Sequence, residues 1–202
     1  MSEHYYSRNP SVESKQQSFS YTLRGHSLTF TTDQGVFSKA EIDFGSRLLI
    51  DSIQIGNVAG NILDVGCGYG PIGITIAKEF PDRVVEMVDV NERALGLAEQ
   101  NAKNNAVENI EVYYSNALND VRQERYAAVI TNPPIRAGKK VVHEIFEEGF
   151  NRLVVGGDLW IVIQKKQGAP SAIEKLKTLT PLVETVAKSK GYFILKATRK
   201  SS

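Results

Sequence analysis

From residue 61 onward the chain alternates short apolar stretches with amphipathic ones, and this alternation restricts the fold more than any other feature. Short apolar runs bounded by loops predict strands, while the stretches between them have the spacing of helices. Strands are expected at 61–65, 84–90, 110–114, 127–131 and 158–163, and helices near 71–80, 91–106, 138–153 and 170–178. This order predicts right-handed crossovers and a largely parallel α/β sheet with helices on both faces.

The two ends of the chain depart from this alternation. Residues 182–189 and 192–198 resemble strands joined only by a tight SKGY turn, so they should pair antiparallel and close the sheet. Residues 18–31 alternate apolar and polar side chains, which predicts a β-hairpin. We expect an N-terminal extension with a β-hairpin or cap over 1–40 and one main domain over 41–202. That domain should open with an amphipathic helix carrying Ile42, Leu48, Leu49 and Ile53.

Composition narrows the class of protein. The net charge is only +1, which argues against a diffusely cationic nucleic-acid binder but not against local basic clusters. Such clusters occur after the 127–131 strand, after the 158–163 strand and near the C-terminus: Arg136, Lys139, Lys140, Lys165, Lys166, Lys188, Lys190, Lys196, Arg199 and Lys200. Each cluster on its own is equally consistent with ordinary solvated surface charge.

Cysteine usage and hydropathy favour a cytoplasmic location. The lone Cys67 excludes an intramolecular disulfide, and the N-terminus lacks the apolar core of a secretory signal. No apolar run approaches the roughly 20 residues needed to span a bilayer, so no membrane association is expected. The three histidines lie far apart without ligand-spaced partners, so we expect no metal site.

A glycine-rich loop follows the first strand of the repeating pattern. Gly66, Gly68, Gly70 and Gly73 let the backbone turn tightly and approach a ligand, and the next helix offers free amide donors at its start. Two cofactors compete for such a loop. Gly68, Gly70 and Gly73 also satisfy the GxGxxG pattern of dinucleotide binding, with Asp89 at the place of a ribose-binding acid.

Asp64 separates these two possibilities. A carboxylate at the mouth of the loop would repel a pyrophosphate but would suit a cofactor that carries an ammonium and a sulfonium group. The stretch LDVGCGYGPIGI resembles motif I of the class I S-adenosylmethionine-dependent methyltransferases. Asp64 could instead be a turn or helix-capping residue, and Asp89 could be a helix cap.

This resemblance implies a fold and a set of cofactor contacts. The fold would be a doubly wound, mostly parallel, seven-stranded Rossmann-like sheet with an antiparallel last strand. Motif I would line the methionine part of the cofactor, Asp89 would accept hydrogen bonds from the ribose hydroxyls, and Asn116 would stand where relatives often place an adenine-binding acid. The cofactor residues implied are Asp64, Gly66, Cys67, Gly68, Gly70, Asp89, Val90, Asn116, Ala117 and Asn132, with Cys67 serving only as a small loop residue.

The segment ITNPPIR, residues 130–136, follows the fourth strand of the pattern. Two prolines stiffen this turn, and [DNS]-P-P at this place is similar to the motif of amino-directed methyltransferases. The side-chain oxygen of Asn132 and the carbonyl of Pro133 would accept both hydrogens of a planar exocyclic amine, aiming its lone pair at the methyl group. Asn132, Pro133 and Pro134 are therefore the candidate catalytic residues, and no catalytic His or Lys is expected. A merely rigid turn is the alternative.

The joint pattern is similar to a narrower family. The segment DQGVFSKAEIDFGSRLLI, motif I and NPPIRAGK together resemble the small methyltransferases whose best-known members methylate guanine N2 in small-subunit ribosomal RNA. In them GVFS covers the cofactor pocket, which adds Phe37, Ser38 and Lys39 as candidates. Ile135, Arg136, Lys139 and Lys39 would meet the substrate, although relatives that stack an adenine or glutamine usually have an aromatic residue at the place of Ile135.

Three functions stay open at this point, beside that of a dinucleotide-dependent oxidoreductase. The first is methylation of RNA, expected to be ribosomal RNA or the small ribosomal subunit. The second keeps the chemistry but changes the acceptor to a protein glutamine amide, an adenine or a small metabolite. The third is a non-catalytic RNA-binding module. Because larger members have two methyltransferase-like halves and this chain corresponds to the active one, it would hold RNA through its N-terminal extension or as a homodimer, or it would not use that substrate.

Overall fold

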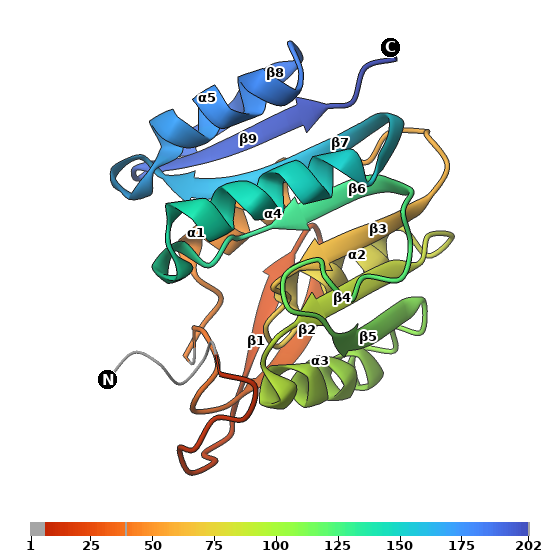
Figure 1. Ribbon diagram of the computed structural model, residues 1–202. Coiled ribbons are helices and arrows are strands. Elements are labelled where there is room, and N and C mark those ends of the chain that lie inside the picture. The colour runs from red at the N-terminus through yellow and green to blue at the C-terminus, as the bar shows by residue number, and fades with distance from the viewer. Residues whose placement is uncertain (1–6, 39, 202) are drawn as a thin grey trace.

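The computed structural model describes residues 7–38 and 40–201. Its main body is a seven-stranded sheet in the order β5-β4-β3-β6-β7-β9-β8, with helices on both faces (Figure 1). Neighbouring strands from β5 to β7 are parallel, and β9 runs antiparallel to β7 and β8. The predicted doubly wound sheet with an antiparallel last strand is thus confirmed. The strands are β3 (Asn61–Val65), β4 (Val85–Asp89), β5 (Ile110–Tyr114), β6 (Tyr126–Thr131), β7 (Leu153–Gln164), β8 (Val183–Ser189) and β9 (Tyr192–Thr198).

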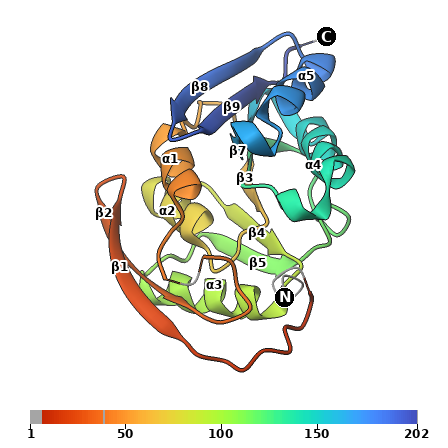
Figure 2. The same ribbon diagram turned by 90° about the vertical axis from the view of Figure 1, so that its left-hand side faces the viewer.

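Two hydrophobic clusters, one on each face of the sheet, hold the helices in place. Helices α1 (Phe44–Ser52), α2 (Pro71–Glu79) and α3 (Glu92–Asn104) contribute buried side chains to one cluster. Helices α4 (Lys139–Asn151) and α5 (Ala169–Leu179) contribute to the other, so the two groups cover opposite faces (Figure 2). The central strand β6 is buried at every position because it is covered on both sides. Two short 3₁₀ turns, η1 (Ile135–Ala137) and η2 (Lys165–Gln167), follow β6 and β7.

The predicted N-terminal hairpin is present as β1 (Gln17–Leu23) and β2 (His26–Thr32), paired antiparallel. Two asparagine side chains, Asn101 of α3 and Asn105 at its C-terminal cap, bond the backbone of β2 as a neighbouring strand would. The side-chain amide of Asn101 bonds both the N–H and the carbonyl of Thr31, and Asn105 does the same with Thr29. Asn101 also donates to the carbonyl of Tyr69 at 2.8 Å. The hairpin is therefore fastened beside the glycine-rich loop.

Two predicted elements have different limits in the structure. Helix α1 begins at Phe44, where the Asp43 side chain caps it by accepting from the Ser46 N–H, so Ile42 precedes the helix and Ile53 follows it. Strand β7 starts five residues before the expected 158, because Gly156-Gly157 forms an irregularity within the strand and not a loop. Within the described residues, no helix is long and apolar enough to cross a bilayer.

Candidate active site

A cavity of about 730 Å³ opens at the carboxyl ends of β3, β4 and β6. Each of these parallel strands delivers a loop to the same edge of the sheet, which is where doubly wound folds bind their ligands. The volume falls within the usual range for small-molecule and cofactor sites. The loop after β3, the end of β4, the loop after β5 and the turn after β6 all contribute to its wall.

The glycine-rich loop forms one side of this cavity. Gly66, Gly68 and Gly70 all have positive φ angles, of 74°, 56° and 101°, which a residue with a Cβ atom adopts at a cost. A Cβ atom built on Gly68 would meet no atom within 4 Å, so the backbone there borders open space. Gly70 precedes Pro71, the first residue of α2. Proline suits this position because the first backbone N–H groups of a helix have no partner within it, and proline has no N–H. The loop thus presents its backbone to whatever fills the cavity.

Asp89 lies at the end of β4 with its carboxylate on the cavity wall. Its oxygens accept from the Gly68 N–H at 2.8 Å and from the Asn91 N–H at 2.9 Å. Burial raises the pKa of Asp89 above its ordinary value, and these backbone hydrogen bonds oppose the shift. The carboxylate therefore holds the glycine loop in place and stays at the surface of the cavity.

Asp64 and Gly70 do not line the cavity, contrary to what the resemblance to motif I implied. Asp64 is fully buried, and its Oδ2 accepts from the Gly73 N–H at 3.0 Å. Burial raises the pKa of Asp64 to about 7, although this hydrogen bond acts in the opposite direction. The side chain points behind the loop because β3 places it towards α2, so it fastens that helix to the strand as a helix-capping residue would.

Asn132 occupies the opposite wall of the cavity, directly after β6. Its Nδ2 donates to Ser46 Oγ at 3.0 Å and approaches Asp43 Oδ2 at 3.5 Å. A carboxylate can only accept hydrogen bonds, so it fixes which end of the amide is the NH₂ group. The Asn132 Oδ1 atom consequently faces away from α1, and no other described residue donates a hydrogen bond to it. This arrangement leaves one oriented acceptor at the cavity wall.

The rest of the NPP turn is only partly on that wall. Pro133, Pro134 and Arg136 line the cavity, whereas Ile135 packs against the hydrophobic cluster under α4. The Pro133 carbonyl already accepts from the Ile135 N–H at 2.9 Å, which leaves one of its two lone pairs for a substrate. Lys139 is exposed but does not line the cavity. Lys39, the remaining predicted substrate contact, lies outside the described residues.

The far end of the cavity is less polar. Val90 follows Asp89, and Asn116 and Ala117 come from the loop after β5; all three line the cavity, and their role in binding adenine stays a prediction. Phe37, from the segment after the hairpin, lines the cavity with 47% of its surface exposed. Cys67 is buried in the loop, and burial raises the pKa of its thiol well above the ordinary value, so it stays a neutral thiol.

Several cavity residues were not predicted from the sequence. Asp43 and Ser46 are the most informative, because they reach Asn132 from a helix 86 or more residues earlier in the chain. A capping pattern, Asp43 followed three residues later by Ser46, marks the start of α1 but does not reveal where that start lies. The others are Ser7, Pro71, Ile72, Asn91, Ala94, Ser115, Ala137, Val141 and Ile145.

Comparison with known families decides between the two classes of cofactor site. Residues 27–196 match the family described as "Methyltransferase small domain". The chain belongs to this family. As a small-domain methyltransferase it is an S-adenosylmethionine-dependent enzyme, and the dinucleotide alternative is set aside.

Individual relatives differ in length. This methyltransferase is 58% identical to the protein YbxB of Bacillus subtilis over 98% of both chains. It is 30% identical to the ribosomal RNA small subunit methyltransferase C of Vibrio cholerae over 81% of its own length but only 48% of the relative's. The chain therefore spans about half of that enzyme.

Solved structures show the same fold. A 16S ribosomal RNA guanine-N2 methyltransferase of T. thermophilus, determined with AdoMet and guanosine, has a TM-score of 0.82 at 24% identity, covering 95% of this chain and 52% of the other. A ribosomal protein methylase of Lactobacillus delbrueckii has a TM-score of 0.65 at 19% identity, covering 78% of each chain. Because proteins named for RNA and protein methylation both share the fold, the fold does not select the acceptor.

The cavity residues fit S-adenosylmethionine. Open space above the Gly68 backbone admits a ligand where any other residue would place a side chain. Asp89 supplies a carboxylate able to accept from two hydroxyls, and Val90 and Ala117 offer an apolar surface to a purine. With Asp64 buried, the carboxylates at the cavity wall are Asp89 and Asp43, and Asp43 lies on the side of Asn132.

Proposed function

We propose that this small-domain methyltransferase methylates an exocyclic amine in RNA, the N2 amine of a guanine in small-subunit ribosomal RNA. The observation that carries the proposal is the orientation of Asn132. Its NH₂ group is bound by Ser46 and Asp43, which leaves its oxygen as an acceptor at the cavity wall. An acceptor is what a conjugated amine needs, because holding its hydrogens directs the nitrogen lone pair out of the ring plane.

The mechanism follows from groups that the chain itself supplies. When bound, S-adenosylmethionine provides an electrophilic methyl group. The Asn132 oxygen and the remaining lone pair of the Pro133 carbonyl would accept the two amine hydrogens and stabilise the positive charge that develops on nitrogen. The prolines limit the motion of these acceptors. The methylated nitrogen is acidic enough to lose its proton to water, so the chain needs no strong base.

Two comparisons support RNA over the other acceptors. The relative of 30% identity is named as a ribosomal RNA small subunit methyltransferase, and the structure with the TM-score of 0.82 is named as a guanine-N2 methyltransferase. Ile135 agrees with a non-adenine acceptor, because it packs into the core and offers no aromatic face to the cavity. The test must distinguish RNA guanine from three alternative methyl acceptors: a protein glutamine, an adenine and a small metabolite.

The test uses methyl-labelled S-adenosylmethionine and small ribosomal subunits from cells that lack this protein. We expect label in 16S RNA at one guanine, located by nuclease mapping and mass spectrometry. Asn132→Ala should reduce turnover by at least 100-fold while changing the dissociation constant of S-adenosylmethionine only a few-fold. Label in a ribosomal protein or in small molecules, or full turnover by Asn132→Ala, would contradict the proposal.

A further inference from the structure

Three segments that meet at the carboxyl edge of the sheet contain no acidic residue. They are 132–143, 162–173 and 185–196, which follow or flank the ends of β6, β7 and β8. The whole chain has 24 Lys and Arg against 23 Asp and Glu, so the acid-free segments reflect an uneven distribution of charge. We name their exposed cations at this edge the basic edge: Arg136, Lys139, Lys140, Lys165, Lys166, Lys188 and Lys190.

The strand register brings the later members of the basic edge together. Gln164 of β7 pairs with Tyr192 of β9, and Tyr192 pairs with Ser189 of β8, so the three lie in one row across the sheet. Lys165 follows Gln164, and its backbone N–H donates to the Gly191 carbonyl at 2.8 Å. Lys190 immediately follows Ser189. Lys165 and Lys190 thus lie at the same end of two strands, β7 and β8, which are separated by β9 and are therefore about 10 Å apart.

Contacts with α1 connect this row to the active site. The Lys190 Nζ lies 4.6 Å from the centroid of the Phe44 ring, and that ring packs 5.7 Å from the ring of Tyr192. Figure 2 shows the ends of β8 and β9 beside α1. Phe44 follows Asp43, whose carboxylate is 3.5 Å from the Asn132 amide. From the other side, Arg136 lines the cavity itself. The basic edge is therefore continuous with the wall that holds Asn132.

Carboxylates do not neutralise most of this edge. Among the described residues, Lys140 forms an ion pair at 3.8 Å with Glu144 of the same helix, and the other five lysines of the basic edge form none. Lys188 and Lys190 instead lie over the faces of Phe193 and Phe44, which holds the charged groups near aromatic rings. An arrangement of cations with intervening aromatic side chains is how proteins hold single-stranded nucleic acid.

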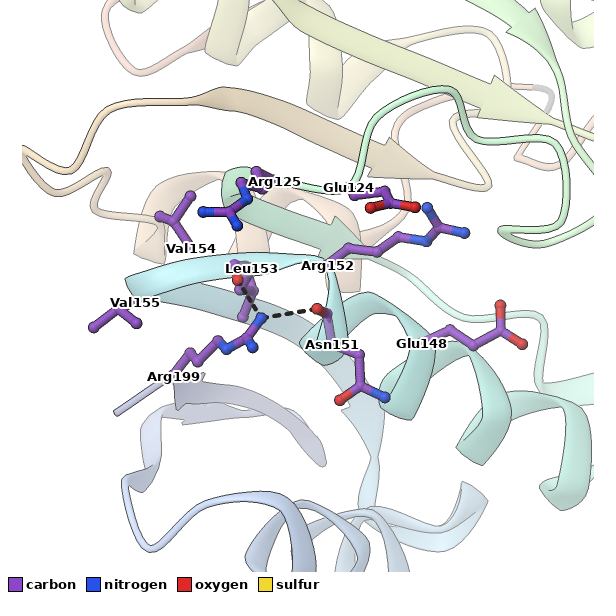
Figure 3. A pocket seen from close by; sticks show the side chains of 9 residues that line it. All are labelled: Glu124, Arg125, Glu148, Asn151, Arg152, Leu153, Val154, Val155 and Arg199. Atoms are coloured by element: carbon purple, nitrogen blue, oxygen red, sulfur yellow. Dashed lines mark hydrogen bonds between the residues drawn. The ribbon is translucent and has the colours of Figure 1, made fainter. Parts of the chain in front are cut away.

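The opposite edge of the sheet has a different arrangement of charge. A cavity of about 580 Å³ there contains Arg125, Arg152 and Arg199, as Figure 3 shows, but also Glu124 and Glu148. Arg199 donates to the Asn151 and Leu153 carbonyls, and Arg152 donates to the Gln123 and Leu118 carbonyls. These arginines fasten loops, and their charge is offset by the two glutamates. This edge therefore serves as a control surface.

We infer that the basic edge binds the phosphate backbone of the RNA strand that carries the target amine, across the ends of β6, β7 and β8. This inference rests on the proposed function. It gives the chain its own RNA-binding surface within one catalytic domain. The strand would run from Arg136 at the cavity past α1 to Lys165 and Lys190, and its phosphates would contact cations while the target base enters the cavity.

The test compares two double variants that lose the same charge. Lys165→Ala with Lys190→Ala alters the basic edge, and Arg125→Ala with Lys200→Ala alters the opposite edge. Binding of a fluorescein-labelled single-stranded RNA is measured by anisotropy at several salt concentrations. Each lost phosphate contact should reduce the slope of log K against log salt by about 0.7. We expect the basic-edge variant to lose about 1.4 in slope and roughly 25-fold in affinity near 0.1 M salt, relative to 1 M.

The control should keep its RNA affinity within two-fold, and both variants should bind S-adenosylmethionine like the wild type, which shows that they fold. Equal losses in both variants, or no loss in either, would overturn the inference. If the wild type methylates RNA and the basic-edge variant keeps its KM for RNA, the inference alone fails. If the wild type neither binds nor methylates RNA, the proposed function fails with it.

Discussion

Asn132→Asp tests whether Asp43 orients the Asn132 amide in solution. The Nδ2 atom lies 3.5 Å from Asp43 Oδ2, and the substitution puts an oxygen in its place. Two unit charges at this distance repel by about 5 kcal/mol at an effective dielectric constant of 20. Solvent screens part of this repulsion because both side chains are only half-buried, so we expect the free energy of unfolding to fall by about 2–4 kcal/mol at pH 8.

The measurement is urea unfolding of four proteins at pH 8. Besides the wild type and Asn132→Asp, these are the double variant Asn132→Asp with Asp43→Asn, and the control Asn132→Asp with Asp51→Asn. Asp51 is an exposed residue of the same helix, so its loss changes net charge equally. Only the Asp43→Asn double variant should recover most of the stability.

This result would also explain why the turn begins with Asn and not with Asp. If Asn132→Asp unfolds like the wild type at pH 8, or if Asp51→Asn restores stability as well as Asp43→Asn does, the two side chains are not in contact and the orientation argument is wrong. Turnover provides a second reading. It should fall in Asn132→Asp, because repulsion by Asp43 displaces the acceptor, and recover in the Asp43→Asn double variant, because the exchanged amide–carboxylate pair again holds residue 132 in place.

Two further predictions concern the buried carboxylates. Asp89→Ala should weaken S-adenosylmethionine by about 1.5–3 kcal/mol, or roughly 10- to 150-fold by calorimetry, through the loss of charged hydrogen bonds; an unchanged dissociation constant would rule out the ribose contact. Asp64 has a pKa raised by burial to about 7, so the stability given by its protonated form is complete below about pH 4 and lost as pH rises through 7. Asp64→Asn keeps an acceptor for the Gly73 N–H but cannot ionise. In urea unfolding between pH 5 and 8, its free energy of unfolding should decline less than that of the wild type. An identical decline in both proteins would show that Asp64 does not titrate in this range.

Local patterns were sufficient to predict most of the sheet. The strands from Asn61 to Thr131 and the closing antiparallel pair follow from apolar runs and short turns, which act over a few residues. The limits of β7 were harder to predict, because Gly156-Gly157 resembles a loop in sequence and forms an irregularity only where β6 pairs beside it. Helix α1 was placed too early because hydrophobic spacing continues through Ile42, whereas the Asp43 cap ends the preceding loop.

The cavity residues that follow strand ends could be predicted from the sequence, whereas those contributed by helices packed on the sheet could not. Asp89 and Asn132 each end a strand, so their arrival at one cavity follows from parallel pairing. Asp64 lies one residue before the end of β3, but the alternation of side chains along β3 directs it towards α2, and the sequence does not say which face α2 covers. Asp43 and Ser46 reach Asn132 only through packing of α1 against β7 and β9, which no local pattern encodes.

The contacts of Asn101 argue against shortening this protein at the expected boundary between residues 40 and 41. Its fully buried side chain forms hydrogen bonds with the backbone of Thr31 in the hairpin and of Tyr69 in the glycine-rich loop. A fragment beginning at residue 41 would remove two of the three hydrogen bonds of this side chain, at a cost of about 0.5–1.5 kcal/mol for each. Shortened versions made for crystallography or engineering should therefore retain the first two strands as an integral scaffold of the catalytic centre.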